Sequence, residues 1–162
     1  MANEPSPKII MYTDGSSLGN PGPGGYGTLL LYGHNKKELS EGFRLTTNNR
    51  MELMAVIAGL EALKKKNSKV TVYTDSRYVV DAVEKGWLLN WIRIRFKGKK
   101  NSDLWMRFYE IYQIHSVKFV WVKGHAAISG NERCDQLAVA AANGTDLLED
   151  EGFLTNNPLS TQ

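Results

Sequence analysis

The chain has 162 residues, of which 42% are hydrophobic, and a formal net charge of +3 at pH 7. This length suits one domain with a proper core, and no apolar run approaches the roughly 18 residues of a membrane-spanning helix. The N-terminal residues lack the apolar segment of a secretory signal. The single cysteine, Cys134, excludes an intrachain disulfide and suits a reducing cytoplasm, which is the expected location.

The first predicted elements are three strands. Residues 1–7 are polar and are expected to form a flexible end. Runs rich in β-branched and aromatic residues then predict strands at residues 8–13, 26–32 and 39–45. The glycine- and proline-rich residues 14–25 are expected to form a turn, and Gly33-His34-Asn35 a second turn. Three successive strands with short connections favour an antiparallel arrangement.

From residue 49 onward, helices and strands alternate. Apolar residues at helical spacing predict a helix that ends in three lysines, whose charge suits a helix C-terminus. This helix is expected to cover residues 49–66. Strands are then expected at residues 70–74 and 117–122, and further helices at residues 76–85, 102–114 and 131–142. Residues 144–162 are expected to form a polar tail that is partly disordered. This order indicates an α/β fold, or an α+β fold, with a mixed sheet flanked by helices.

Five residues of the types that hold metal ions follow or begin these predicted elements: Asp14, Glu52, Asp75, His125 and Asp135. Each also has an ordinary structural interpretation. Asp14 suits a turn, Glu52 a capping box counted from Asn49, and Asp75 a helix N-cap. Asp135 suits a solvated helix face, and a lone histidine is usually structural.

Fold geometry favours grouping the acidic residues. Ligands gather at the carboxyl ends of strands in α/β sheets, where Asp14 and Asp75 are expected, and Glu52 lies on the intervening helix. Two divalent cations about 4 Å apart repel by roughly 4 kcal/mol even in water. Four carboxylates would neutralise their charge.

Residues 85–100 are rich in basic residues and contain no acid. The cations are interleaved with Trp87, Trp91 and Phe96, and they are Lys85, Arg93, Arg95, Lys97, Lys99 and Lys100. A solvated basic helix and loop is one interpretation. Basic and aromatic residues interleaved in this way more often mark a nucleic-acid surface.

A glycine pattern, G-x-G-x-x-G over residues 22–27, raises the alternative of a dinucleotide-binding site. That motif needs a helix to begin at its last glycine. The residues that follow, TLLLY, are typical of a strand. A tight reversal of the chain near a ligand is therefore the favoured interpretation.

Taken together, these segments resemble the bacterial type 1 ribonuclease H family over residues 8–142. The resemblance is carried by the motifs TDGSSLGNPGPGGYG, TTNNRMEL, TDSRYV, NSDLW and WVKGHA…NERCDQLA. It implies a ribonuclease H-like fold with a five-stranded mixed sheet and a catalytic domain over residues 8–143. The implied reaction is endonucleolytic hydrolysis of the RNA strand of RNA–DNA hybrids, which leaves 5′-phosphate and 3′-hydroxyl ends.

The resemblance also implies roles for single residues. Asp14, Glu52, Asp75 and Asp135 would hold two Mg²⁺ ions, with Mn²⁺ as an alternative. His125 would be a proton shuttle, and Glu132 an auxiliary acid near it. Thr47 and Asn101 match a pocket for a DNA-strand phosphate. The full set of implied substrate contacts is Ser17, Asn20, Thr47, Asn48, Asn49, Arg77, Trp87, Trp91 and Asn101. The expected partner is an RNA–DNA hybrid, with no membrane, and the protein is expected to be a monomer.

The sequence departs from the family pattern at several positions. Ser17 stands where many relatives have cysteine, and Arg77 where many have glutamine. The residues after His125, Ala127 to Gly130, also differ, and the basic segment is shorter. Two rival functions stay open: a catalytically inactive hybrid-binding module and an integrase-like polynucleotidyl transferase.

Overall fold

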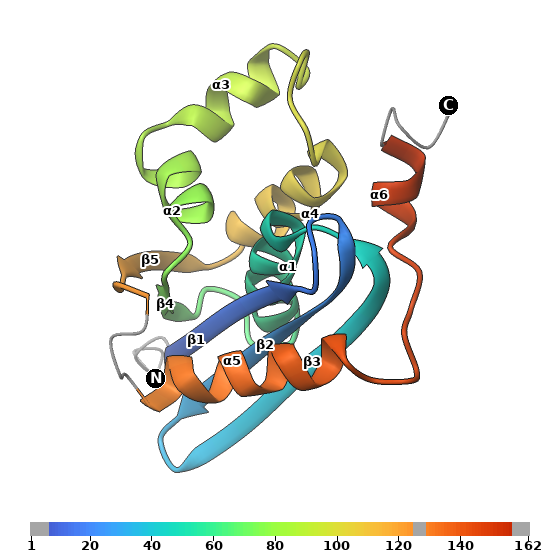
Figure 1. Ribbon diagram of the computed structural model, residues 1–162. Coiled ribbons are helices and arrows are strands. Elements are labelled where there is room, and N and C mark those ends of the chain that lie inside the picture. Colours follow the sequence, from blue (N-terminus) through green and yellow to red (C-terminus); the bar gives the residue numbers. More distant parts are fainter. Residues whose placement is uncertain (1–6, 125–128, 157–162) are drawn as a thin grey trace.

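A single five-stranded mixed sheet forms the centre of the molecule, with strand order β3-β2-β1-β4-β5 (Figure 1). The structure is a computed structural model and describes residues 7–124 and 129–156. Antiparallel pairing joins the first three strands, and β1, β4 and β5 pair in parallel. The strands are β1 (Lys8–Ser17), β2 (Gly22–Tyr32), β3 (Asn35–Thr46), β4 (Lys69–Thr74) and β5 (Ser116–Trp121). The predicted mixed sheet is thereby confirmed.

Helices cover both faces of this sheet. Helices α1 (Asn48–Glu61) and α4 (Ser102–Tyr112) lie on one face, and α5 (Ser129–Ala142) crosses β1, β2 and β3 on the other (Figure 1). Helix α2 (Arg77–Glu84) follows β4, and α3 (Trp87–Arg93) stands out from the body of the molecule. The last helix is α6 (Glu151–Asn156). No helix in the described part of the chain is long and apolar enough to cross a membrane.

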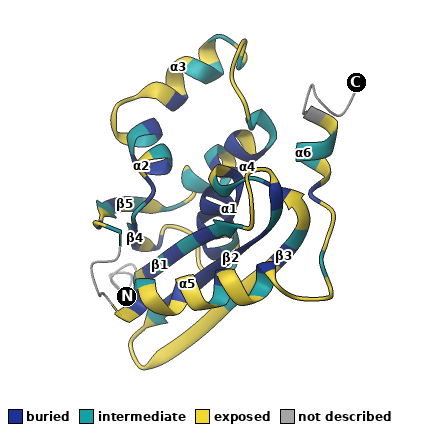
Figure 2. Ribbon diagram, viewed as in Figure 1, coloured by how far each residue is buried: buried dark blue, intermediate teal, exposed yellow. Residues whose placement is uncertain are grey.

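The main core lies between the sheet and α1. Most of α1 is buried, including Leu53, Ile57 and Leu60, and Trp105 and Phe108 of α4 complete this layer (Figure 2). The outer face of α5 and most of α3 are exposed (Figure 2). The core therefore fixes the position of α1, and with it the position of Glu52.

The glycine-rich segment does not form the long turn that the sequence predicts. Strand β1 continues to Ser17 and β2 already begins at Gly22. The reason is tertiary packing, because a Cβ atom on Gly27 would lie 2.3 Å from the Cys134 carbonyl oxygen. A Cβ atom on Gly25 would lie 2.5 Å from the Ala138 carbonyl oxygen. These glycines let α5 approach β2 closely. Because strand residues follow Gly27, the dinucleotide-binding alternative is excluded.

Three other expectations about the elements were wrong or incomplete. Helix α1 ends at Glu61, before the three lysines, which lie in the exposed turn that leads to β4. Helix α3 was not predicted, because its seven residues are too few to show a helical periodicity. The segment expected to be a tail contains α6 and a parallel bridge between Leu148 and Phe43. Disorder in residues 157–162, which lie outside the described residues, stays a prediction.

We predict that Gly27→Ala lowers the free energy of unfolding by about 1–3 kcal/mol or more, because the added methyl group would push α5 away from the sheet. Ser40→Ala is the matched control, since Ser40 is the exposed partner of Gly27 on β3. Urea unfolding monitored by circular dichroism measures both variants. Equal midpoints for the two would contradict the close approach of α5.

Candidate metal centre and nucleic-acid surface

Parallel pairing of β1 with β4 places two acidic residues side by side. Tyr12 is the partner of Tyr73 in the register, and Asp14 and Asp75 each lie two residues further along. Carboxylate oxygens of Asp14, Glu52 and Asp75 all lie within 4.8 Å of one another. The structure thus brings together three of the four carboxylates predicted as ligands, from β1, α1 and the end of β4.

Glu52 reaches this cluster because Gly15 has no side chain. A Cβ atom on Gly15 would lie 2.4 Å from the Glu52 backbone nitrogen, so α1 lies directly against β1. The Glu52 side chain is 6% exposed, and its Oε1 atom has no hydrogen-bond partner among the residues that the structure describes. A buried, unpaired carboxylate oxygen is costly unless a cation or water satisfies it.

The capping interpretations of Glu52 and Asp75 are excluded by where the helices begin. The N-cap of α1 is Thr47, whose hydroxyl accepts from the Arg50 backbone N–H at 3.3 Å, so Glu52 lies beyond the capping-box position. The N-cap of α2 is Ser76, which accepts from Val79 N–H at 3.2 Å. Both acids are therefore left for another role.

Proximity of the carboxylates changes their protonation. Burial, followed by the charges of Asp75 and Asp135, raises the pKa of Asp14 from 3.8 to about 8. Burial and the charges of Asp14 and Asp75 raise the pKa of Glu52 well above its usual value. Protons or metal ions must therefore offset the negative charge near neutral pH. An all-oxygen set of this kind fits a hard divalent cation such as Mg²⁺.

Asp135 is the fourth predicted ligand and lies on α5, exposed to solvent. Its carboxylate is close enough to Asp14 to raise the pKa of that residue. One turn earlier on α5, the half-buried Asn131 side chain donates to the Thr13 and Tyr73 carbonyl oxygens at 3.4 and 3.1 Å. Asn131 thereby ties α5 to the two strands that carry Asp14 and Asp75. Sequence analysis missed this residue.

His125 lies outside the described residues. The residue before it, Gly124, is next to the cluster, because a Cβ atom there would lie 3.2 Å from Asp75 Oδ2. Glu132, the predicted auxiliary acid, is exposed in the first turn of α5.

Several predicted substrate contacts gather near the start of α1. Asn20, in the turn between β1 and β2, accepts from the Asn48 backbone N–H at 3.0 Å. Asn48 and Asn49 are the first two residues of α1, and Asn49 is exposed. Ser17 ends β1 nearby in sequence and is half-buried. A hydrogen bond thus joins two segments that lie far apart in the sequence into one polar surface.

Arg77, at the start of α2, is held against a tryptophan that sequence analysis did not select. Its guanidinium carbon lies 4.0 Å from the centre of the Trp121 ring, and its Nη1 lies 3.8 Å from an Asp81 oxygen. The Trp121 indole N–H donates to the Asp75 backbone oxygen at 3.1 Å. A single indole therefore contacts both Arg77 and a member of the carboxylate cluster. An aromatic residue ending a predicted strand was the available signal.

The basic segment forms α3 and the loop after it. Trp87 and Trp91 lie with ring centres 6.5 Å apart, and Lys85 and Lys99 lie 5.3 and 5.7 Å from these two rings. Most of the segment is exposed. The tryptophans thus support a projecting surface of positive charge.

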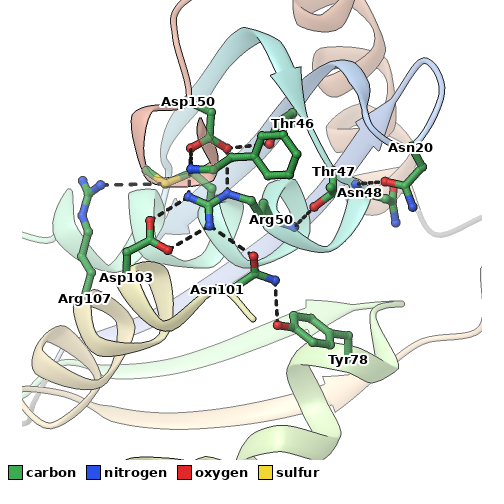
Figure 3. A network of polar contacts seen from close by, with 12 residues as sticks. Asn20, Thr46, Thr47, Asn48, Arg50, Tyr78, Asn101, Asp103, Arg107 and Asp150 are labelled. Atoms are coloured by element: carbon green, nitrogen blue, oxygen red, sulfur yellow. Dashed lines mark hydrogen bonds and ion pairs between the residues drawn. The ribbon is translucent and has the colours of Figure 1, made fainter. Parts of the chain in front are cut away.

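Asn101 belongs to a network centred on the fully buried Arg50 (Figure 3). Arg50 donates to both Asp150 oxygens at 2.7 and 2.9 Å, and to both Asp103 oxygens at 2.9 and 2.7 Å. It also donates to Asn101 Oδ1 at 3.2 Å. Sequence analysis missed Arg50. Its signal was a cation on the helix face that carries Leu53, Met54 and Ile57.

Comparison with known proteins identifies many relatives. A protein-family model described as RNase H matches residues 6–143. Ribonuclease H of Syntrophus aciditrophicus is 53% identical over 157 residues, which cover 94% of this chain and 90% of the relative. Ribonuclease H of Desulforamulus reducens is 57% identical over 145 residues, which cover 86% of this chain and 91% of the relative.

Solved structures have the same fold. LC9-RNase H1, described as a type 1 RNase H with the type 2 active-site motif, is similar with a TM-score of 0.78 and 35% identity. The match covers 87% of this chain and 74% of that one. LC11-RNase H1 in complex with an RNA/DNA hybrid has a TM-score of 0.59 and 26% identity, with 83% and 96% covered.

The raised pKa values lead to a prediction about the metal-free protein. Between about pH 4 and pH 8, folded Asp14 binds a proton that the unfolded chain has lost, so stability falls as the pH rises through this window. Asp14→Asn should weaken this fall, and exposed Asp146→Asn should not. Urea midpoints in chelator at several pH values measure the slopes. A parent midpoint that rises steadily with pH would contradict the clustering.

Proposed function

This chain belongs to the ribonuclease H family, and from this premise we propose that Asp14, Glu52, Asp75 and Asp135 hold two Mg²⁺ ions. The protein is an endoribonuclease that hydrolyses the RNA strand of RNA–DNA hybrids, leaving 5′-phosphate and 3′-hydroxyl ends. The observation that carries the assignment of the site is the approach of three carboxylates within 4.8 Å. When bound, two such ions activate a water molecule and stabilise the leaving oxygen.

The choice of Mg²⁺ follows from the ligand atoms. All four side chains offer carboxylate oxygens, which suit Mg²⁺ and also suit Mn²⁺. Neither thiol nor imidazole belongs to the proposed set, so a preference for zinc is not expected. Buried Glu52 would be the most rigid ligand, whereas exposed Asp135 would adjust most easily during turnover.

We assign proton transfer to His125. Support comes from Gly124, the residue before His125, which lies next to Asp75 at the edge of the carboxylate cluster. An imidazole can gain or lose a proton near neutral pH, so His125 would move a proton at the site and aid release of the 5′-phosphate product. Glu132 would assist it by charge.

We assign the hybrid to the surface that runs from the cluster to α3. Ser17, Asn20, Asn48, Asn49 and Arg77 would contact the minor groove, where the 2′-hydroxyl distinguishes RNA from DNA. Thr47 and Asn101 would bind a phosphate of the DNA strand, and Trp87, Trp91 and the neighbouring cations would hold that strand further along. The hybrid found with LC11-RNase H1 supports this partner. We further propose that the enzyme is a monomer and is located in the cytoplasm.

We predict that Asp14→Asn keeps the fold and loses nearly all cleavage, because a neutral amide cannot replace an anionic ligand shared by metal ions. Asp146→Asn, an exposed acid outside the cluster, should cleave like the parent. The measurement is cleavage of matched hybrid, double-stranded RNA and double-stranded DNA, with and without chelator. Substantial Mg²⁺-dependent cleavage by Asp14→Asn would refute the ligand assignment.

The same assay separates the rival functions. An inactive hybrid-binding module would bind hybrid without cleaving it. An integrase-like transferase would act on double-stranded DNA. The family enzyme should cleave only the RNA strand of the hybrid.

We predict that alanine at five cations of the basic segment raises KM far more than it lowers kcat. Each lost phosphate contact should also reduce the salt slope of binding by about one. The five are Arg93, Arg95, Lys97, Lys99 and Lys100.

A charge-matched control replaces five lysines near the N-terminal end of β1, away from the carboxylate cluster. They are Lys36, Lys37, Lys64, Lys65 and Lys66. Equal changes of affinity and salt slope in the two variants would show a general charge effect and remove the role of the α3 surface.

A further inference from the structure

One carboxylate in the C-terminal segment connects to both residues of the proposed phosphate pocket. Asp150 Oδ2 accepts from the Thr46 hydroxyl at 2.6 Å and from Arg50 Nε at 2.7 Å (Figure 3). Thr46 directly precedes Thr47, and Arg50 donates to Asn101. Asp150 is therefore connected to each pocket residue through one intervening residue, to Thr47 through Thr46 and to Asn101 through Arg50. In the sequence it lies 100 residues from Arg50.

Asn101 depends on this network for its conformation. Its backbone lies in the left-handed region, at φ 65° and ψ 30°, although it is the N-cap of α4. Its side chain does not cap the helix. The carbonyl oxygen accepts from Arg50, and the amide donates to the Tyr78 hydroxyl at 3.0 Å. An asparagine amide has two N–H donors, so one stays available for a phosphate oxygen.

Thr47 is placed in a similar way. Its hydroxyl oxygen accepts from the Arg50 backbone N–H, so its own O–H can donate to a phosphate. The residue before it is fixed because buried Thr46 donates to Asp150. Both donors of the pocket are therefore oriented by groups that contact Asp150.

The energetics make Asp150 the critical partner of Arg50. The Arg50 side chain is 1% exposed, whereas its two acidic partners, Asp103 and Asp150, are 30% and 10% exposed. A cation buried so deeply needs its hydrogen bonds, because removal of one partner leaves an uncompensated charge. Backbone hydrogen bonds from Leu148 to Gly42 and from Arg44 to Leu148, at 2.8 and 2.9 Å, bring the segment to this position.

We propose that Asp150 is a positioning residue for hybrid binding, which holds Asn101 and Thr47, through Arg50 and Thr46, in the arrangement that takes a DNA-strand phosphate. The inference rests on the proposed function, because the pocket residues are themselves assigned there. It gives the C-terminal segment a part in substrate affinity, in addition to any part in stability.

The test measures hybrid affinity of Asp150→Asn by fluorescence anisotropy, with Ca²⁺ in place of Mg²⁺ to slow cleavage. Its neighbour Glu149→Gln is the matched control, because Glu149 pairs only with exposed Arg44 among the described residues. We expect Asp150→Asn to bind about tenfold more weakly and Glu149→Gln to bind like the parent. Circular dichroism at the assay temperature verifies that each variant is folded.

A second set of substrates separates positioning from general weakening. A series of hybrids is used, each with one neutral methylphosphonate at a different position of the DNA strand. The phosphate in contact with Asn101 is the one whose replacement lowers the affinity of the parent but not that of Asn101→Ala. At that position, Asp150→Asn should lose little further affinity, because the contact is already absent. If Asp150→Asn does not fold, Thr46→Val carries the same comparison, since it removes only the hydrogen bond to Asp150.

The outcomes are distinguishable. Unchanged affinity in folded Asp150→Asn, with weaker binding by Asn101→Ala, would overturn this inference and leave the proposed pocket intact. Unchanged affinity in Asn101→Ala would overturn the pocket itself, and this inference with it. A loss of affinity in Asp150→Asn that is equal at every methylphosphonate position would also overturn positioning, since no single phosphate is then involved.

Discussion

The parallel pairing of β1 with β4 is the constraint on which the site depends. It brings Asp14 of β1 beside Asp75, which directly follows β4, so that the two carboxylates face the same space. Gly15 then admits α1, and Glu52 enters as the third carboxylate. Burial and the neighbouring like charges both oppose ionisation here, and together they raise the pKa of Asp14. Bound protons or a bound cation are thus an electrostatic requirement of the arrangement, before any chemistry is considered.

Charge is separated along the molecule in a way that suits its substrate. The carboxylates gather where Asp14 of β1 lies beside the end of β4, and the exposed cations lie on α3 and its loop, which project from the sheet (Figure 1). In the proposed complex a hybrid duplex would need both, because its phosphates would be attracted by the projecting cations while the scissile phosphate approaches an anionic cluster. Under the proposed function, bound metal ions would make that second approach favourable. Arg77, stacked on Trp121 beside Asp75, adds positive charge where the two regions meet.

Much of this was predictable from local sequence, because the apolar and β-branched runs that form the strands are local patterns. The predicted strands placed Asp75 correctly, directly after β4, and the mixed sheet was predicted. Asp14 was expected to follow the first strand, but β1 continues past it to Ser17. Local patterns could not decide between ligand and helix cap for Glu52 and Asp75. That decision rests on the N-caps of α1 and α2, which are Thr47 and Ser76. The glycines of β2 were assigned to a turn because their reason, close packing of α5, is tertiary.

The Arg50–Asp150 ion pair was beyond sequence reasoning, since nothing local connects residues 100 positions apart. Asp150 lies in a polar segment whose sequence is typical of a tail.

The most direct test of the central claim is calorimetry of Mg²⁺ binding near pH 7 in buffers of different ionisation enthalpy. Because metal must displace protons from the cluster, the account predicts net proton release, smaller in Asp14→Asn. Mg²⁺ binding without proton release, or equal release by both proteins, would contradict it.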